Sequence, residues 1–288
     1  MHGVSVGQVS GQGALEKVVA SARPAEEQPP VPGGAAGLGA GFAAALAAAG
    51  ADVALCDVQT KVHDVAATIA RTSGRRVIAT VADVRDAAAV HNWVNGAVAQ
   101  LGGPDIVIAN AGIWRPTDPL ADDWEKVQAD WQLLVETNLR GVFLTGRAAI
   151  PHLIARGGGN IVNIATDHIC PPAGFATGGG TRMDVYDASK WGINGLTQSW
   201  AKRLAANGIR VNALCMDATD SEMVRYAAGS RATPAIVASW MQPAQIATLL
   251  LDLLAEGPAG RTGENIGIWL GQPIVLPPRA AVLPSRHP

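Results

Sequence analysis

The sequence has little charge and no long apolar run. Charged residues make up 16% of the 288 residues, and the net charge is −2. A chain so balanced has no electrostatic attraction to nucleic acid or to an anionic membrane, so we expect neither as a partner. No apolar segment reaches the ~18 residues that a membrane-spanning helix needs. The N-terminal segment also lacks the basic start and apolar block of a signal peptide.

Cysteine is scarce as well. The three cysteines, Cys56, Cys170 and Cys215, lie far apart, and no pair has the Cys-x-x-Cys spacing. An odd number without that spacing argues against a disulfide framework and against a zinc site. We therefore expect a cytoplasmic protein without a bound metal.

Apolar residues are abundant, at 48% of the chain. Short segments rich in Val and Ile alternate with helical ones, which is typical of βαβ units in a parallel sheet covered on both faces. The expected strands are Asp52–Cys56, Arg76–Val81, Asp105–Ala109, Asn160–Ala165, Ile209–Leu214 and Asn265–Leu270. The expected helices are Leu38–Ala49, Val62–Arg71, Ala87–Leu101, Asp123–Ile154, Tyr186–Ala206 and Pro243–Ala255. We predict an α/β fold: a single Rossmann-type doubly wound domain over residues 33–270, then a Pro-rich tail at 271–288.

Residues 1–32 form an irregular segment that does not follow this plan. A doubly wound sheet begins with a central apolar strand that runs directly into a Gly-rich turn. Here Arg23–Pro32 precedes the turn, and its acidic residues and prolines exclude a buried central strand. Lys17–Ala22 offers a first strand if the chain makes a detour before the turn. The alternative is a segment of non-ancestral origin, for example after a change of reading frame.

A Gly-rich turn, Gly33-Gly34-Ala35-Ala36-Gly37-Leu38-Gly39, opens the first long helix. Glycines let the backbone approach a pyrophosphate, and a helix N-terminus offers unpaired N–H groups and a partial positive charge. A tightly packed Ala/Gly tract is the alternative interpretation. Asp57, at the end of the next strand, is placed to bind ribose hydroxyls and to repel a 2′-phosphate. Because the turn contains no Arg or Lys, the pattern favours NAD over NADP.

Tyr186 and Lys190 stand at the start of an expected helix. Residues four apart share a helix face, so the phenol and the ammonium group are expected to point the same way.

Together these motifs resemble the short-chain dehydrogenase/reductase family. The resemblance rests on the Gly-x3-Gly-x-Gly turn, on Asn110-Ala111-Gly112, on Asn138-Leu139-Arg140-Gly141-Val142-Phe143, and on Tyr186-x3-Lys190, in family order. It implies an oxidoreductase that interconverts an alcohol and a carbonyl compound with a nicotinamide cofactor. It also implies a homodimer or homotetramer that pairs the long helices carrying Asn138 and Tyr186.

The resemblance implies a catalytic set of Asn138, Thr166, Tyr186 and Lys190. Tyr186 would act as general acid/base, its phenolate favoured by the Lys190 ammonium group and by the cationic nicotinamide. Lys190 would also hold the nicotinamide ribose. Asn138 would order a water in a proton relay, or else serve only as a polar residue within a long helix. Thr166 stands in the place of a substrate-orienting serine, whose hydrogen bond its hydroxyl can make.

The resemblance also implies a set of cofactor contacts, with Asp83 and its neighbour near the adenine and Asn110 mainly supporting the sheet. The set is Gly33, Gly37, Leu38, Gly39, Asp57, Asp83, Val84, Asn110, Ala111, Gly112, Tyr186, Lys190 and Thr219. One departure stands out: Met216-Asp217 occupies the place of the usual Pro-Gly. An Asp near the nicotinamide would weaken phenolate formation or favour the oxidised cation, depending on its distance.

Tryptophans cluster around the expected site, with Trp114, Trp124 and Trp131 after the fourth strand and Trp240 in the segment expected to cover the pocket. With Ile169, Pro171, Pro172 and Phe175, they suggest an apolar pocket for a cyclic or aromatic substrate. The same residues also suit a core or a subunit interface. Asp167 and His168, next to Thr166, are further candidates for substrate contact.

The sequence thus predicts an NAD-dependent oxidoreductase that interconverts a small secondary alcohol and a ketone. A binding protein of the same fold with an impaired cofactor site is one alternative, favoured by Arg23–Pro32 and Met216-Asp217. A non-redox reaction such as dehydration is another, and it agrees less well with the retained Tyr186 and Lys190. Cofactor binding separates the first two hypotheses.

Overall fold

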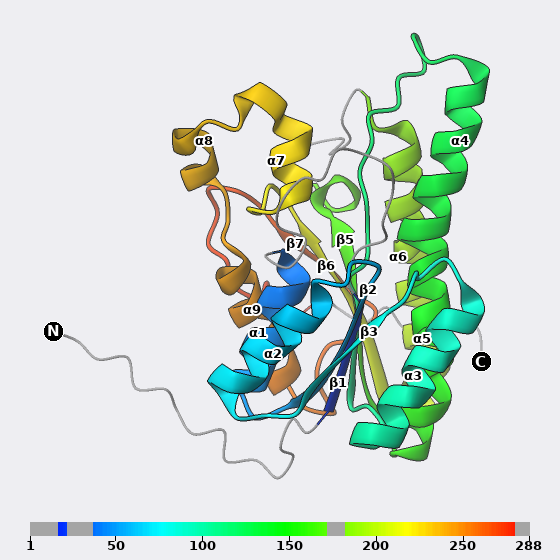
Figure 1. The fold of residues 1–288 in the computed structure, drawn as a ribbon, viewed down its shortest axis with the longest axis vertical. Coiled ribbons are helices and arrows are strands. Elements are labelled where there is room, and N and C mark those ends of the chain that lie inside the picture. Colours follow the sequence, from blue (N-terminus) through cyan, green and yellow to red (C-terminus); the bar gives the residue numbers. More distant parts are fainter. Residues whose placement is uncertain (1–16, 22–36, 172–181, 280–288) are drawn as a thin grey trace, which may run out of the picture.

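Seven parallel strands form one sheet at the centre of the protein, seen in a computed structural model that describes residues 17–21, 37–171 and 182–279 (Figure 1). The strands are β1 (Lys17–Ser21), β2 (Asp52–Asp57), β3 (Val77–Val81), β4 (Ile106–Ala109), β5 (Gly159–Thr166), β6 (Ile209–Met216) and β7 (Asn265–Ile268). Their order is β3-β2-β1-β4-β5-β6-β7. The sheet therefore grows outward from its middle in both directions, and the predicted doubly wound Rossmann-type fold is confirmed.

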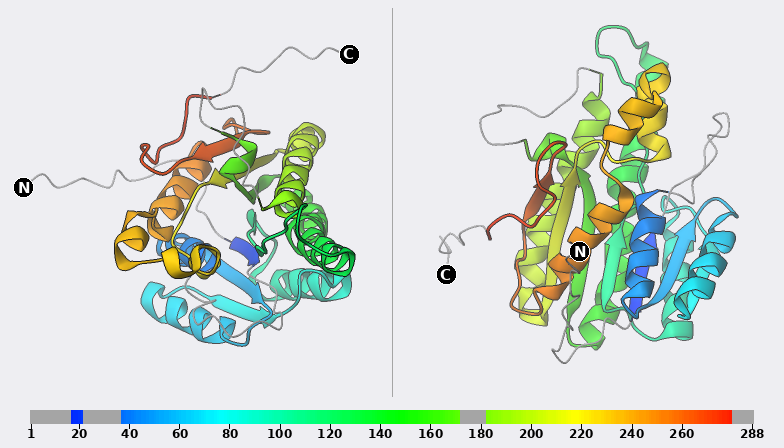
Figure 2. Two further views of the ribbon diagram at one scale, coloured as in Figure 1. Left: turned by 90° about the horizontal axis from the view of Figure 1, so that it is seen from above. Right: turned by 90° about the vertical axis from the view of Figure 1, so that its left-hand side faces the viewer.

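Helices cover both faces of the sheet (Figure 2). One face carries α1 (Leu38–Ala48), α2 (Val62–Ser73) and α9 (Pro243–Ala255); the other carries α3 (Ala87–Leu101), α5 (Gly141–Ala155) and α6 (Asp184–Leu204). Successive strand residues alternate between the two apolar cores: Ile106 and Ile108 pack with α1 and α9, whereas Val107 packs with α3 and α5. The sheet therefore lies between two helical layers, with an apolar core on each of its faces.

The central strand β1 comes from the irregular N-terminal segment. Its backbone pairs with β2 on one side and with β4 on the other; Val18 lies opposite both Val53 and Ile106. This is the stretch that the sequence offered as a first strand, and the chain reaches α1 only after residues 22–36, which lie outside the described residues.

The long helical stretch after β4 is interrupted by a π-helical turn. The sequence predicts one helix over Asp123–Ile154, whereas the structure has α4 (Trp124–Val135), a π segment (Glu136–Arg140) and then α5. Single π turns inside α-helices are frequent at functional sites. Asn138, a predicted catalytic residue, lies within this one.

Two short helices that the sequence analysis did not predict, α7 (Glu222–Ala228) and α8 (Pro234–Ser239), stand over the carboxyl ends of the strands (Figure 1). Ligands of open α/β sheets bind at this edge. Three 3₁₀ turns complete the elements: Asp167–Ile169, Ala205–Asn207 and Gly229–Arg231. Within the described ranges, no helix is long and apolar enough to cross a membrane.

Candidate active site

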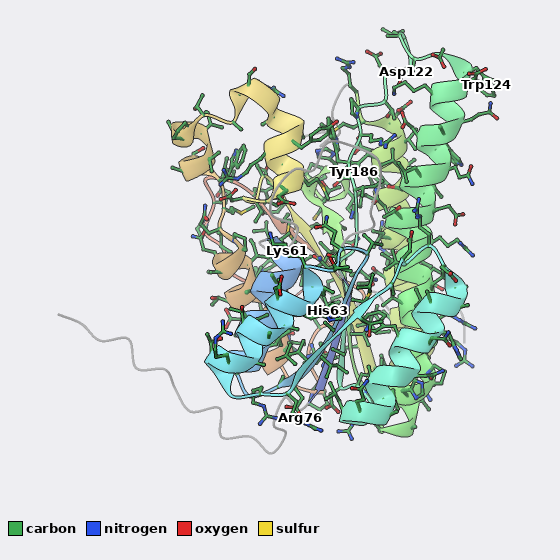
Figure 3. All side chains as sticks on the ribbon, in the orientation of Figure 1. Lys61, His63, Arg76, Asp122, Trp124 and Tyr186 are labelled. Carbon is green, nitrogen blue, oxygen red and sulfur yellow. The ribbon has the colours of Figure 1, made fainter. Side chains whose placement is uncertain are left out.

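A cleft opens at the carboxyl edge of the sheet, bounded by the N-terminus of α1, by α6 and by α7. Its volume is about 870 Å³, including the part open to solvent. Eight residues that the sequence analysis selected line it: Gly37, Leu38, Gly39, Asn110, Gly112, Tyr186, Lys190 and Thr219. Figure 3 shows Tyr186 in the region between α7 and the α4–α6 side of the molecule.

Tyr186 and Lys190 occupy the first turns of α6 and face the cleft together. The Tyr186 side chain is 9% exposed and that of Lys190 is 3% exposed. The Lys190 ammonium group donates a hydrogen bond of 2.9 Å to the carbonyl oxygen of Ile164 at the end of β5. Its Nζ atom lies 5.9 Å from the centre of the Tyr186 ring. The predicted pairing of phenol and ammonium group is therefore present in the geometry.

Burial shifts the pKa of both side chains. It raises the pKa of Tyr186 well above that of a free phenol; Asp187 and Asp167 raise it further, and a hydrogen bond with Thr166 lowers it only in part. Burial also lowers the pKa of Lys190 to about 8. In the protein without a bound cofactor, burial thus disfavours the charged form of each group, and the predicted phenolate, which requires the cationic nicotinamide as well as Lys190, stays a prediction. The neutral phenol is suited to donate a proton.

Asn138 fixes the loop that follows β4. The side chain is fully buried. Its Oδ1 atom accepts a hydrogen bond from the Ile113 N–H at 2.8 Å, and its Nδ2 group donates to the Ile113 carbonyl oxygen at 3.0 Å and to Ser189 Oγ at 3.1 Å. A Cβ atom placed on Gly112 would come within 3.4 Å of Asn138 Oδ1 and 3.3 Å of Lys190 Nζ. Asn138 therefore ties this loop to α6 beside Lys190.

Thr166 ends β5, buried next to Tyr186. Its hydroxyl donates to Asp167 Oδ1 at 3.1 Å. Burial and the charge of Asp217 raise the pKa of Asp167. The neighbouring His168 Nδ1 lies 2.6 Å from Asp187 Oδ1; burial lowers the pKa of His168, but Asp187 outweighs this and the net shift is upward. A cluster of acidic groups thus adjoins the Tyr186 end of the cleft.

The N-terminus of α1 presents backbone amides to the cleft. Gly37 caps the helix without a side-chain hydrogen bond, and the first turn contains no acidic residue. Among the described residues, no atom lies within 4 Å of a Cβ atom built on Gly37, so this part of the chain leaves a ligand room to approach the backbone. Asp57 ends β2, is 3% exposed, and accepts a hydrogen bond from the Gln59 N–H at 2.9 Å. Gly33, selected with Gly37, lies outside the described residues.

The remaining candidates for cofactor contact are buried or bonded to neighbouring residues. The Asp83 carboxylate forms an ion pair with Arg85 at 2.7 Å, and Val84 is buried. Ala111 is likewise buried. Thr219 is 2% exposed and donates through its hydroxyl to the Asp217 carbonyl oxygen at 3.0 Å.

The tryptophans do not form one pocket. Trp124 and Trp131 on α4 are 73% and 53% exposed, and Trp240 is buried beside the Thr219–Met241 bridge. Trp114 packs against the cluster that contains Tyr186 and makes an edge contact with Tyr226 of α7, with ring centres 6.3 Å apart. The residues named as substrate contacts, Trp114, Asp167, His168 and Trp240, are not among the described residues that line the cleft.

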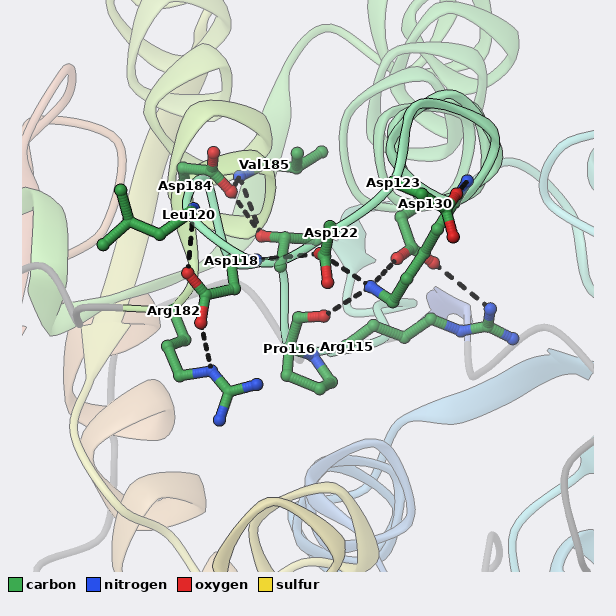
Figure 4. Close-up of polar contacts among 12 residues, drawn as sticks. Arg115, Pro116, Asp118, Leu120, Asp122, Asp123, Asp130, Arg182, Asp184 and Val185 are labelled. Atoms are coloured by element: carbon green, nitrogen blue, oxygen red, sulfur yellow. Dashed lines mark hydrogen bonds and ion pairs between the residues drawn. The ribbon is translucent and has the colours of Figure 1, made fainter.

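A polar network holds the loop after β4 against α4 and α6 (Figure 4). The Lys126 ammonium group donates to Asp130 at 2.6 Å and to the Pro116 carbonyl oxygen at 3.1 Å. The Thr117 hydroxyl donates to Asp184, the first residue of α6. The loop that carries Trp114 is thereby fixed to the helix that carries Tyr186.

This chain matches the family model described as short chain dehydrogenase over residues 30–231. The chain belongs to the short-chain dehydrogenase family.

Other short-chain dehydrogenases resemble this one over most of their length. A cis-4-hydroxycyclohexanecarboxylate dehydrogenase from Sinomonas cyclohexanicum is 34% identical, with 85% of this chain and 95% of that protein covered. A 2-dehydro-3-deoxy-L-rhamnonate dehydrogenase (NAD(+)) from a Sphingomonas species is 39% identical over 64% of this chain and 68% of the other. The crystal structure of levodione reductase superposes with a TM-score of 0.73 and 26% identity, covering 88% of this chain and 95% of that one.

Short-chain dehydrogenases use a nicotinamide cofactor, and the cleft has the features such a group needs. The uncapped α1 N-terminus suits its phosphates, and the Lys190 ammonium group suits a ribose hydroxyl. Within the described part of the chain, no group of three or more His, Cys, Asp or Glu side chains could hold a metal ion.

The sequence analysis missed the part of the cleft that comes from α7. Glu222, Met223 and Val224 of α7 line it together with Ser221, whereas the sequence analysis singled out only the preceding Met216-Asp217 and Thr219 in this part of the chain. A local signal was present: Ser221 caps α7 by accepting a hydrogen bond from the Val224 N–H at 3.3 Å, a common use of serine before a helix.

Proposed function

We propose that this short-chain dehydrogenase is a cytoplasmic, NAD-dependent oxidoreductase that interconverts a secondary alcohol and a ketone, with Tyr186 as general acid/base. One observation carries the proposal: Tyr186 and Lys190 lie together, buried, in a cleft that also receives the N-terminus of α1.

Tyr186 supplies the proton in this proposal. The nicotinamide, when bound, provides or accepts the hydride. In the direction of ketone reduction, the Tyr186 hydroxyl, which its raised pKa keeps protonated, donates its proton to the carbonyl oxygen. In alcohol oxidation Tyr186 must first lose its proton, which the Lys190 cation favours electrostatically. Thr166 orients the substrate oxygen once its hydroxyl turns from Asp167, and Asn138 takes part in a water relay.

NAD is proposed as the cofactor because of Asp57. Its carboxylate, at the end of β2, suits two ribose hydroxyls and opposes a 2′-phosphate. The N-terminus of α1 and Asn110–Gly112 would hold the phosphates and the nicotinamide side, and Asp83 with Val84 would lie near the adenine. The relative whose name includes NAD(+) is consistent with this assignment.

A cyclic or aromatic substrate is proposed from the apolar surroundings of Tyr186. Ile113, Trp114 and Met183 pack against the cluster formed by Tyr186, Val185 and Leu134. This cluster adjoins the cleft, whose own lining includes the apolar Ile164, Met216 and Met223. Such surroundings favour a flat or cyclic hydrocarbon body over a charged chain. The relative from Sinomonas, named for a hydroxycyclohexanecarboxylate, supports the same substrate class.

The test is turnover of a panel of cyclic secondary alcohols with NAD⁺ or NADP⁺, followed by the absorbance of the reduced cofactor. We expect activity with NAD⁺, and a loss of kcat in Tyr186→Phe of about 10²- to 10⁴-fold with NADH binding retained. Equal turnover by wild type and Tyr186→Phe would refute the assignment of Tyr186. Product without any change in cofactor absorbance would favour the non-redox alternative.

A binding protein with an impaired cofactor site remains the competing hypothesis, and Met216-Asp217 is its remaining support in the cleft. It predicts that the folded protein binds neither NADH nor NADPH.

A homodimer or homotetramer is also proposed. Phe143 on α5 and Trp191 on α6 are 41% and 51% exposed, which suits an interface that pairs these helices. Light scattering on the purified protein gives the mass directly, and a monomer at micromolar concentration would contradict this.

A further inference from the structure

Asp217 places a carboxylate at the reacting end of the cleft. It follows the last residue of β6 and lines the cleft together with Tyr186 and Lys190. Its place at the end of β6 brings it to the carboxyl edge of the sheet. In the proposed reaction, one substrate group exchanges a proton with Tyr186 and a hydride with the cofactor. The nicotinamide ring must therefore lie close to Tyr186, at this same edge.

The backbone holds this carboxylate in place. Asp217 Oδ1 accepts a hydrogen bond from the Ala218 N–H at 2.6 Å, and Oδ2 accepts one from the Leu270 N–H at 3.1 Å. The Asp217 N–H donates to the Ile268 carbonyl oxygen at 2.9 Å. These partners are neutral peptide groups, so they fix the side chain without cancelling its charge.

Neighbouring charges strengthen the negative character of this end. Asp217 is close enough to Asp167 for its charge to raise the pKa of that carboxyl, and it acts likewise on His168. The buried Glu222, at the start of α7, lines the same cleft. The opposing cation that lines the cleft is Lys190, whose pKa burial lowers to about 8.

We propose that Asp217 makes this site bind oxidised NAD⁺ in preference to NADH. The nicotinamide ring carries a positive charge when oxidised and none when reduced, so a fixed carboxylate beside it stabilises the oxidised form selectively. By thermodynamic linkage, a residue that tightens NAD⁺ binding relative to NADH shifts the enzyme toward the complex that accepts an alcohol. The inference rests on the proposed function, because it requires a nicotinamide in this cleft.

The experiment measures the dissociation constants of NAD⁺ and NADH by calorimetry at fixed ionic strength. Asp217→Asn removes the charge and keeps the size of the side chain. We expect it to raise the ratio Kd(NAD⁺)/Kd(NADH) by about threefold to tenfold over wild type, the size expected of one nearby charge in a partly screened site.

Two controls isolate the charge. Asp217→Glu keeps it and should leave the ratio near the wild-type value. Asp252→Asn removes one charge from an exposed position on α9 and should leave the ratio unchanged. If Asp217→Asn fails to fold, as judged by thermal melting, Asp217→Ser tests the same prediction.

An unchanged ratio in the folded, neutralised variant overturns the inference while leaving the proposed function intact. Failure of wild type to bind either NAD⁺ or NADH overturns the proposed function, and this inference with it. A ratio that rises in the neutralised variant and not in Asp217→Glu supports it.

Discussion

At the scale of single residues, Lys190 is the side chain whose environment has the clearest consequence for stability. Its ammonium group is buried at the carboxyl end of β5, where it donates a hydrogen bond to the Ile164 carbonyl oxygen, and its pKa falls from 10.5 to about 8. Between pH 8 and pH 10.5, Lys190 binds more protons in the unfolded chain than in the folded one. The contribution of Lys190 to the free energy of unfolding therefore rises with pH.

Comparison with Lys190→Met isolates this contribution. We expect the free energy of unfolding of wild type, minus that of the variant, to rise by about 2 kcal/mol between pH 7.5 and pH 10. Urea denaturation at several pH values measures it. Lys202→Met, an exposed lysine of the same helix, is the control, and no such pH-dependent change is expected for it. A flat difference for Lys190→Met would contradict the burial of a charged lysine.

Tyr186 shows which residue properties the sequence cannot supply. The spacing of Tyr186 and Lys190 correctly predicts that they face one cleft, because helix geometry fixes this locally. The burial that raises the pKa of Tyr186 in the protein without a cofactor could not be read from the sequence, since burial depends on distant elements. The same holds for Asn138. The motif around it predicts a place in the catalytic set, whereas its three hydrogen bonds depend on how the loop after β4 meets α6.

At the scale of elements, the contact between α5 and α6 depends on a glycine. A Cβ atom on Gly146 would lie 2.4 Å from the ring of Trp200, a rigid side chain that is itself 8% exposed. We expect Gly146→Ala to lower the free energy of unfolding by about 1–3 kcal/mol, because the helices must separate to admit a methyl group.

Gly195→Ala is the matched control for this substitution. Gly195 lies on α6, and no atom of the described ranges comes within 4 Å of an added Cβ atom. Alanine in an exposed helical position raises the free energy of unfolding by about 0.5–1 kcal/mol relative to glycine. Chemical denaturation compares the two variants, and equal effects of the two substitutions would show that α5 and α6 do not approach this closely.

The elements themselves were predictable where a pattern is long. Ala87–Leu101 and Pro243–Ala255 coincide with the observed α3 and α9, because an apolar face repeats over several turns. α7 and α8 are too short to show such a period. The π turn at Glu136–Arg140 was missed because the helical pattern continues through it, and only the hydrogen bonding changes.

At the scale of the whole molecule, β1 joins the two halves of the sheet. It pairs with both β2 and β4, so a chain without it leaves two apolar strands unpaired in the middle of the fold. We expect deletion of residues 1–21 to abolish cooperative unfolding and soluble expression, whereas deletion of residues 1–16 removes no described strand and should leave both. A soluble, cooperatively folded product of the longer deletion would show that β1 is dispensable.

The most direct test of the proposed function is a calorimetric titration of the purified protein with NADH and with NADPH. With the uncapped α1 N-terminus open to the cleft and Asp57 at the end of β2, we predict NADH binding at about micromolar Kd and NADPH binding weaker by tenfold or more. Asp57→Asn should narrow that difference. Tighter binding of NADPH would contradict the role of Asp57, and no binding of either would contradict the assignment of this protein as a working nicotinamide-dependent dehydrogenase.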